Sequence, residues 1–394
     1  MNVFRSYIYQ SSSDFLRALL WEIKYVFRDR AVFFSFVVVA SLVSFVYTYL
    51  YSEETLKELP VGVVDEDNST NSRQLLRMID ATSQVRIVAS YHSLSEAHRD
   101  FELEKIRGVI TIPANFGRSL QRGEQPSLSV YADASYMLYY KQVLTAAKLS
   151  ATYMNAGVEM KRNSAQGKLP TQAKEEAQPV KPTVVGLYNP AAGYATALIP
   201  VILVIIFQTT ILTAVGILGG TMREGSKLPH IYPNAGHFWG TMPIVMGRAT
   251  AYLLLSMGVL LSVLYIVMPL FGIPVRGNVL SVFVFMTPFI LSIVFMGIAL
   301  MHFFKRREDA IMLIMYTSLP AVVLTGFSWA WSAMPQWLHC IAYLVPTTLG
   351  AKGFVSLTQL EASLTTILPF WGGMWLLCIF YLILASLTMC RLLR

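Results

Sequence analysis

Charged residues are scarce in this chain of 394 residues. Asp, Glu, Lys and Arg together make up 14% of the sequence, whereas 55% is hydrophobic and the mean hydropathy is +0.51. This composition is typical of an integral membrane protein with several spans and argues against a soluble enzyme. Cysteine is equally rare, and the positions of Cys340, Cys378 and Cys390 indicate neither a disulfide framework nor a metal site.

Catalytic motifs are also missing. The sequence contains no GxxxxGK[ST] phosphate loop, no GxSxG and no HExxH, so we expect the chain itself to hold no ATP, no cofactor and no catalytic residue. Asp65, Glu66 and Asp67 form a carboxylate cluster that is open to two interpretations. It is either a cation site or, as we expect, a turn that ends a strand and caps the following helix.

The net charge of +8 is not evidence for nucleic-acid binding, because it is unevenly distributed. Residues 52–190 contain 16 basic and 16 acidic residues and are therefore neutral. The excess of positive charge lies in the segments that flank hydrophobic runs, where basic residues orient a membrane protein. We therefore expect a lipid bilayer, and no nucleic acid, as a partner.

Uncharged hydrophobic runs predict six transmembrane helices. The first, residues 31–51, has 21 residues without a charge, enough to cross roughly 30 Å of hydrocarbon. The other five are residues 191–219, 249–271, 279–302, 310–329 and 366–390. The predicted fold is a membrane α-helical protein with an inserted α/β domain. Its parts are 1–30, an amphipathic region, 31–51, the first span, 52–190, the insertion with a long helix and linker, and 191–394, the other five spans.

Basic residues predict the orientation of these spans. Thirteen lie in short segments on one side, and the opposite short loops contain only Arg276 and Lys352. The thirteen are Arg5, Arg17, Lys24, Arg28, Arg30, Arg223, Lys227, Arg248, Lys305, Arg306, Arg307, Arg391 and Arg394. Because basic short loops stay in the cytoplasm, we expect both termini to be cytoplasmic and the insertion to be external. In a bacterium this means a multi-pass inner (plasma) membrane protein with a periplasmic domain.

Residues 12–30 predict an amphipathic helix that lies along the membrane surface. Ser12 or Ser13 is its expected N-cap. Two faces are expected at helical spacing, an apolar one with Phe15, Leu19, Ile23 and Val26 and a basic one with Arg17, Lys24 and Arg28. The alternative is an ordinary basic flank that precedes the first span.

The insertion alternates strand and helix patterns, which predicts a compact α/β unit. Strands are expected at 59–67, 85–91, 107–113 and 127–134, and helices at 72–81, 93–104 and from Phe116 to Gly123. A long helix over 136–162 and a connector rich in Pro, Lys and Glu over 166–182 follow.

The polar residues within the spans are uncharged amides and hydroxyls. They are Gln208, Thr209, Thr210 and Thr213 in the second span and Thr317, Ser318 and Thr325 in the fifth. These groups either line a translocation path or bond neighbouring helices, and the packing role is the commoner one. Carboxylates within the spans, which proton-coupled carriers need, are missing, so a secondary transporter is disfavoured. Beyond the fifth span, Trp329, Trp331 and Trp337 indicate an interfacial belt, and we expect short helices over 335–360.

Three segments resemble the permease subunits of type-2 ABC exporters (ABC-2 exporter membrane subunits). They are LPVGVVDEDNSTNSRQLLRMIDA with RGVITIPANFGRSL and LSVYADASYML in the insertion, YNPAAGYATALIPVILVII at the second span, and LTGFSWAWSAMPQWLHCIAYLVPTTLGAKGFVSL after the fifth. The resemblance covers essentially the whole chain. It implies that two six-span permeases, a homodimer or a related heterodimer, form a pathway driven by separate ABC ATPase subunits that bind the ATP and Mg²⁺.

The same resemblance implies roles for particular residues. Arg17, Trp21, Lys24 and Arg28 match the family's interfacial elbow helix. Arg223, Glu224, Gly225 and Ser226 match its R-E-x-G-T coupling pattern, except that Glu and Gly are adjacent and Ser replaces Thr, and an ordinary loop is the alternative. The candidate pathway lining is Gln208, Thr209, Thr210, Thr213, Thr325 and Phe327. A periplasmic adaptor and an outer-membrane channel are further candidate partners.

The expected function is therefore that of a permease subunit of an ATP-driven exporter for hydrophobic or amphipathic substrates, because the spans offer apolar and hydroxyl surfaces but no fixed charge. The alternative is a membrane sensor that binds a ligand with its external domain. A sensor needs an output partner, since the interior cytoplasmic segments are shorter than about 30 residues. An intramembrane enzyme is disfavoured because no span carries a nucleophile or a metal set.

Overall fold

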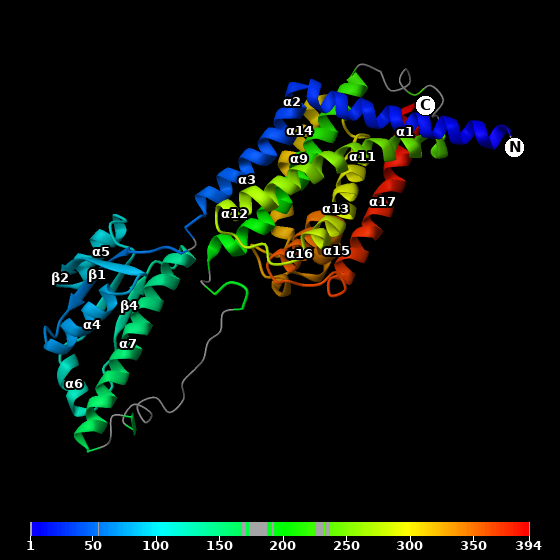
Figure 1. Ribbon diagram of the computed structural model, residues 1–394. Coiled ribbons are helices and arrows are strands. Elements are labelled where there is room, and N and C mark those ends of the chain that lie inside the picture. The colour runs from blue at the N-terminus through cyan, green and yellow to red at the C-terminus, as the bar shows by residue number, and fades with distance from the viewer. Residues whose placement is uncertain are drawn as a thin grey trace. The chain divides into compact units, whose positions relative to one another are not determined.

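The chain divides into two compact units. The structure, a computed structural model, describes residues 2–53, 55–167, 171–172, 187–190, 193–224, 232 and 237–393. The helical unit comprises Met1–Glu54 and Gly186–Arg394, and the inserted unit comprises Thr55–Val185 (Figure 1). Each unit has its own hydrophobic core.

The helical unit consists of helices of very different lengths. Four long ones form most of it: α9 (Tyr194–Glu224), α11 (Phe238–Ser262), α13 (Val279–Leu300) and α17 (Leu368–Leu393). The N-terminal part is α1 (Asn2–Arg28), α2 (Arg30–Phe33), η1 (Phe34–Val38) and α3 (Val39–Leu50). The remainder is η2 (Val263–Val267), α12 (Met268–Leu270), α14 (Arg307–Leu324), η3 (Trp331–Ala333), α15 (Gln336–Leu344) and α16 (Pro346–Thr358).

Length and composition qualify five helical stretches as membrane spans. They are Arg30–Leu50, Tyr194–Glu224, Phe238–Leu270, Val279–Leu300 and Leu368–Leu393. The pair α15 and α16, bent by 84°, makes up to six, and these are the short helices expected over 335–360. The predicted span 310–329 corresponds to α14, but that helix already ends at Leu324 and begins with three charged residues, which leaves a shorter uncharged run.

The predicted start of the third span is wrong. Helix α11 begins at Phe238, eleven residues before Ala249, so Arg248 lies inside the helix and not at its edge. The residues from 238 to 247 are uncharged and mostly apolar. Contacts with other helices support the helix there, because the Thr241 hydroxyl donates to the Ser386 carbonyl of α17 and Gly247 packs on Phe15 of α1. With α12 the helical stretch has 33 residues, more than the roughly 20 that a bilayer requires.

Helix α9 is the centre of the helical unit. It packs against α3, α13, α14 and α16, and 72% of its most apolar window is buried. Small residues allow close packing: a Cβ atom on Gly216 would lie 2.6 Å from the Cβ of Ala310, and one on Gly220 would lie 2.6 Å from the Cα of Arg307. Helix α14 is therefore held against α9 at backbone distance.

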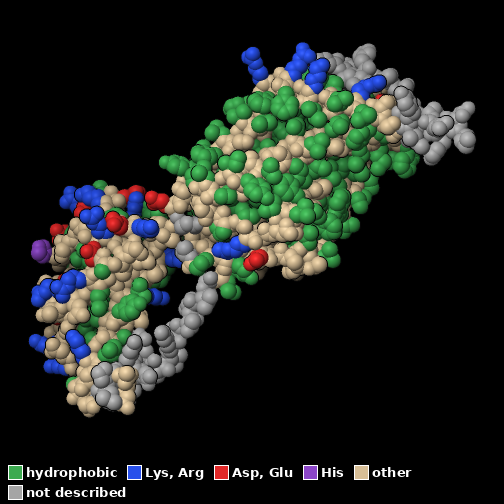
Figure 2. Space-filling view, viewed as in Figure 1, with side chains coloured by type: hydrophobic (Ala, Val, Ile, Leu, Met, Phe, Trp, Pro, Cys, Tyr) green, Lys and Arg blue, Asp and Glu red, His purple; other side chains and the backbone are tan. Residues whose placement is uncertain are grey.

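Hydrophobic side chains cover most of the face of the helical unit that Figure 2 shows, whereas basic ones gather at the end where α1 and α2 meet. Large exposed residues include Leu254 and Ile266 beside α11 and Leu376 and Ile379 on α17. An apolar surface of this extent is expected of a protein in contact with lipid.

The inserted unit contains a four-stranded mixed sheet. Its strands are β1 (Leu59–Asp65), β2 (Val85–Tyr91), β3 (Gly108–Ile112) and β4 (Ser129–Ala132), in the order β2-β1-β3-β4. Strand β1 is parallel to β2 and β3, and β4 is antiparallel to β3. Helices α4 (Thr70–Asp80) and α7 (Met137–Ala165) pack on one face and α5 (Leu94–Glu102) on the other, while α6 (Phe116–Arg122) contacts α4.

Strands and helices of this unit appear where the sequence predicts them. The Asp65 cluster is the expected turn: one oxygen of Asp65 accepts from the amides of Asp67 and Asn68, and the other accepts from the Ser72 hydroxyl of α4. Ser69 is the actual N-cap of α4, and Ser93 caps α5 as expected. The connector predicted over 166–182 lies mostly outside the described residues.

Candidate functional site

Arg223 is the last but one residue of α9 and caps the end of α13. Its Nη1 atom donates to the carbonyl oxygens of Met301, His302 and Phe304 at 2.9, 2.8 and 2.6 Å. These carbonyls follow the last turn of α13, where helix carbonyls have no partner within the helix and favour a cation. We call this part of the helical unit the Arg223 end.

Glu224 connects α9 with α14. Its Oε1 atom accepts a hydrogen bond of 2.8 Å from the backbone N–H of Arg307, the first residue of α14. The guanidinium of Arg307 in turn donates to both carboxylate oxygens of Asp29 at 3.2 Å. Asp29 is the N-cap of α2 and accepts from the amides of Ala31 and Val32.

Asp29, Arg223, Glu224 and Arg307 therefore form one chain of contacts, which we call the Arg223 cluster. It joins the start of the first span, the end of α9, the end of α13 and the start of α14. Gly220 places the α9 backbone directly against Arg307. The end of α9 is therefore connected through these contacts to α13, α14 and α2. The two remaining residues of the predicted coupling set, Gly225 and Ser226, lie outside the described residues.

The predicted elbow helix is longer than expected. Helix α1 begins at Asn2, so Ser12 and Ser13 are inside it and neither is its N-cap. Arg17, Lys24 and Arg28 are exposed as predicted, and Trp21 stacks on Tyr25 with ring centroids 4.1 Å apart. Figure 1 shows α1 across the end of the helical unit at which α17 ends.

The buried face of α1 differs from the predicted apolar face. Ala18, Glu22 and Val26 are fully buried, whereas Leu19 and Ile23 are only half-buried. A Cβ on Gly247 of α11 would meet the carbonyl oxygen of Phe15 at 2.3 Å, so the backbones of the two helices touch. This close crossing is possible because both helices present small residues there.

A fully buried ion pair lies between α1 and α11. The Nε of Arg248 donates to the Oε1 of Glu22, and the Tyr252 hydroxyl lies 3.3 Å from Oε2; both charged side chains are 0% exposed. Sequence reasoning missed this pair because it placed Arg248 at a helix edge. The signal in the sequence was the position of Glu22, which is four residues from both Ala18 and Val26 and therefore lies on the same helix face as these two apolar residues.

Polar residues predicted to line a pathway fall into two groups. Gln208, Thr210 and Thr325 are buried. The Oε1 of Gln208 accepts from the amide of Thr347 in α16 at 3.1 Å, and Thr210 and Thr325 donate to carbonyls of their own helices. Only Gln208 therefore joins two helices, as the packing role requires, whereas Thr210 and Thr325 make local bonds that assign them neither role.

The second group is accessible. Thr209 and Thr213 are half-buried along one stripe of α9, and Phe327, beyond the end of α14, is 39% exposed. The neighbouring α14 carries Thr317 and Ser318 and leaves Tyr316 and Leu319 each 73% exposed. Both α9 and α14 therefore carry hydroxyl groups that are at least partly accessible, and α14 adds exposed apolar groups.

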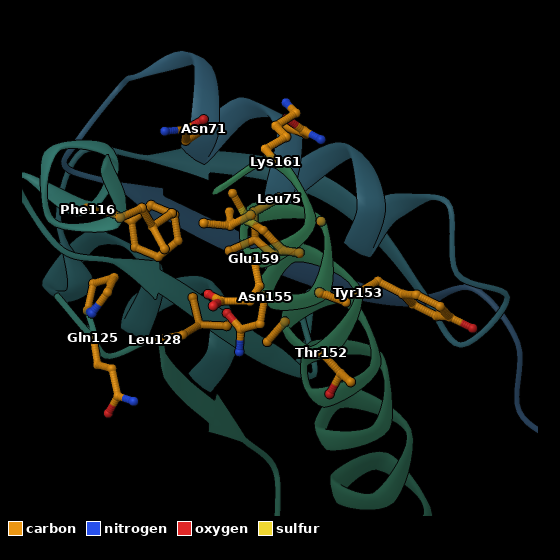
Figure 3. Close-up of a pocket in the computed structure, with 18 of the residues that line it drawn as sticks. Asn71, Leu75, Phe116, Gln125, Leu128, Thr152, Tyr153, Asn155, Glu159 and Lys161 are labelled. Atoms are coloured by element: carbon orange, nitrogen blue, oxygen red, sulfur yellow. The ribbon is translucent and has the colours of Figure 1, made fainter. Parts of the chain in front are cut away.

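A groove lies on the inserted unit between α4, α6 and α7, with a volume of about 1260 Å³. Figure 3 shows Leu75, Phe116 and Leu128 on one side and Asn155 and Glu159 of α7 facing them. The lining thus mixes apolar contacts with amide and carboxylate groups. No cluster of three metal-ligating side chains occurs among the residues that the structure describes.

Two side chains on the opposite face of that sheet have shifted pKa values. Hydrogen bonds from the Lys105 ammonium and from the Tyr91 hydroxyl, both 2.9 Å, hold the pKa of Asp100 below its usual value. Burial, together with this carboxylate, raises the pKa of Tyr91 to about 12. The arrangement is structural: it ties α5 to β2 and places no group of altered pKa in the groove.

Comparisons with known proteins agree with this architecture. Residues 30–387 match the family described as ABC-2 family transporter protein. The chain is 21% identical over 319 residues to a protein of Escherichia coli K12 named "Probable multidrug ABC transporter permease YbhR", covering 80% of this chain and 81% of the relative. It is 22% identical over 346 residues to the "Probable multidrug ABC transporter permease YbhS" of the same organism, covering 86% and 85%.

A more distant relative is the "ABC transporter G family member 20" of Dictyostelium discoideum, 19% identical over 342 residues, which are 82% of this chain and 43% of the relative. The family match includes the candidate spans except the last six residues of α17, the inserted unit, and the Arg223 cluster except Asp29. The chain therefore belongs to the ABC-2 transporter family and is a multi-pass membrane permease.

Proposed function

We propose that this permease is the membrane subunit of an ATP-driven exporter. A separate ABC ATPase binds the Arg223 end, hydrolyses ATP there with its own Mg²⁺, and drives conformational change in the spans. The observation that carries the proposal is the Arg223 cluster. It joins four helices at one end of the unit, through the residues that the family's coupling pattern matches.

The cluster supports a mechanical role for the coupling segment. Glu224 is exposed and ends α9, and the coupling residues Gly225 and Ser226 follow it directly. A force applied to this segment acts on α9, and through Arg223 on α13, through Glu224 on α14 and through Arg307 on α2. Because packed helices have few alternative arrangements, such a force favours a shift between discrete states.

We place the translocation surface on α9, which carries the partly accessible Thr209 and Thr213, and on the exposed face of α14, which packs on α9. A second copy of the chain, or a related permease, covers this face, because Tyr316 and Leu319 offer a large apolar area next to the hydroxyl groups of Thr317 and Ser318. The substrate is hydrophobic or amphipathic, in keeping with the word "multidrug" in the names of the two bacterial relatives.

The proposed location is the bacterial inner membrane, with the Arg223 end in the cytoplasm and the inserted unit in the periplasm. The excess of basic residues in the short segments of the Arg223 end supports this orientation. A periplasmic adaptor, which would lead to an outer-membrane channel, contacts α7, the longest helix of the inserted unit with 29 residues.

Purification of the chain from its native membrane tests the proposal. An ABC ATPase should co-purify, and its ATP hydrolysis should depend on Glu224. The variant Glu224→Lys removes the acceptor of the Arg307 amide and places a cation beside Arg223, so we expect docking or ATPase activity to be lost. Glu308→Lys is the matched control, because it makes the same charge change at an exposed position in the first turn of α14.

Three outcomes are informative. Loss of ATPase activity in Glu224→Lys but not in Glu308→Lys supports both export and the coupling site. If an ATPase binds and neither substitution changes its activity, the exporter proposal stands and the coupling role of Glu224 is rejected. If no ATPase co-purifies, the exporter proposal fails, and the sensor alternative, with the groove of the inserted unit as ligand site, takes its place.

A further inference from the structure

Lys352 of α16 lies against aromatic side chains of η3 and α15, the segment that connects α14 with α16. Its Nζ atom is 3.3 Å from the ring centroid of Trp331 and 6.0 Å from that of Tyr343. The other face of the Trp331 indole is stacked on His339, with centroids 4.4 Å apart and planes within 5°. His339 also bonds the carbonyl of Trp331 at 3.0 Å. We call these four residues the Lys352 cluster.

The geometry fixes the position of the ammonium group. The indole stacks on His339 and makes a T-shaped contact with Tyr343, with centroids 5.4 Å apart, and both contacts restrict movement of the ring away from the cation. Gly326, in the left-handed region with φ of 79°, allows the chain to pass close to the ring. A cation placed over such a ring is favoured, most of all where water is partly excluded.

Lys352 has no anionic partner: within the described parts of the chain, no carboxylate lies within 4.0 Å of its ammonium. Arg276, whose guanidinium lies beside the C-terminal end of α16, has no free role of this kind, because it donates to the carbonyls of Tyr188 and Gln359. An ammonium over an aromatic ring still has N–H groups directed away from the ring. These donors are available to an anion, which would form charge-assisted hydrogen bonds with them.

The surroundings of the cluster are apolar and accessible. Trp329 and Trp337 are 60% and 65% exposed, and Ile341 and Leu344 of α15 are 46% and 50% exposed. A lone fixed cation beside such a surface matches an amphiphile, whose anionic head binds the cation and whose chain lies on the apolar side chains. We propose that the Lys352 cluster binds the anionic headgroup, phosphate or carboxylate, of a membrane lipid or another amphiphile.

This site needs neither an ATPase nor transport, so its test is independent of the proposed function. The probe is dodecyl phosphate, titrated calorimetrically into the full chain purified in an uncharged detergent. We expect Lys352→Gln to weaken binding about 10- to 100-fold, as loss of a charge-assisted bond does, and Lys352→Arg to retain it. Lys148→Gln, which removes an exposed lysine from α7 of the inserted unit, should change nothing.

Two further probes separate the contributions of head and chain. Inorganic phosphate should bind at least about tenfold more weakly than dodecyl phosphate, because it has no methylene groups to bury. Unchanged binding to Lys352→Gln, at an unaltered melting temperature, would overturn the site, and equal affinity for inorganic phosphate would overturn the amphiphile. In lipid nanodiscs, phosphatidylglycerol should compete with the probe if bilayer lipid is the natural source, and should not if the source is another amphiphile; either result retains the site.

Discussion

Removal of one member of the Glu22–Arg248 pair should destabilise the helical unit more than any surface change. Both side chains are 0% exposed, and the Nη2 atom of Arg248 already lacks a hydrogen-bond partner in the described structure. Glu22→Gln keeps the shape and removes the charge that compensates the guanidinium. Breaking a buried pair in this way costs about 3–5 kcal/mol, because an uncompensated charge stays buried.

The magnitude can be measured as a melting temperature. For a unit of more than 200 residues, about 2 °C is lost per kcal/mol, so Glu22→Gln should lower the transition by about 6–10 °C. The assay is scanning fluorimetry of the full chain in detergent, since all seven tryptophans belong to the helical unit. The control is the pair of Arg17 and Asp14, 3.8 Å apart, in which the Arg17 side chain is 55% exposed. Arg17→Gln should cost less than about 1 kcal/mol.

The double substitution Glu22→Leu with Arg248→Met separates charge from packing. Because a buried pair replaced by apolar groups is often neutral, the double variant should melt within a few degrees of the unaltered protein and well above Glu22→Gln. If Glu22→Gln melts like Arg17→Gln, or if the double variant is as unstable as the single one, the pair does not join α1 to α11 as the structure indicates.

Three further substitutions test other contacts. Gly220→Ala should cost about 1–3 kcal/mol by the same fluorimetry, because its Cβ would meet the backbone of Arg307, whereas Gly258→Ala, with nothing within 4 Å, should be neutral or stabilising. Leu319→Cys on α14 should form disulfide-linked dimers in membranes of a variant without native cysteines, and Leu261→Cys on α11, also exposed, should not; equal cross-linking of both would reject the α14 interface. The low pKa of Asp100 implies stability that is present above about pH 4 and is lost as the pH falls through its folded pKa. Asp100→Asn should therefore lower the calorimetric transition of the inserted unit at pH 7, and the effect should diminish as the pH falls below about 4; an effect that does not diminish with falling pH would contradict this.

Local patterns were sufficient to predict most of the fold. Strands such as Val85–Tyr91 and helices such as Thr70–Asp80 have their own caps and periodicity, so a single sequence identifies them. Helix ends determined by tertiary contacts were not predictable. Helix α11 begins at Phe238, although the His237 side chain makes no cap hydrogen bond, and it packs along α1.

The sequence was sufficient to identify residues of the candidate site but not their contacts. Arg223 and Glu224 could be identified by resemblance, but their partners are 78 and 83 residues away in sequence, and nothing local indicates them. Periodicity gives the phase of a residue on its own helix and says nothing of the helix that it faces. The same limit hid Glu22, whose phase indicated burial, while its partner Arg248 is 226 residues away.

The two clusters of arginine and carboxylate have different physical roles. Glu22 and Arg248 are fully buried. Separation of α1 from α11 would therefore break the ion pair and leave two uncompensated charges, which costs a large free energy. Arg307 and Asp29 are 32% and 18% exposed, where water can replace a broken contact at small cost. Helix α1 is thus fixed to α11, whereas the contact between α2 and α14 can open and close. A force at the Arg223 end should therefore move α9 and α14 against the rest of the unit and leave the α1–α11 pair intact.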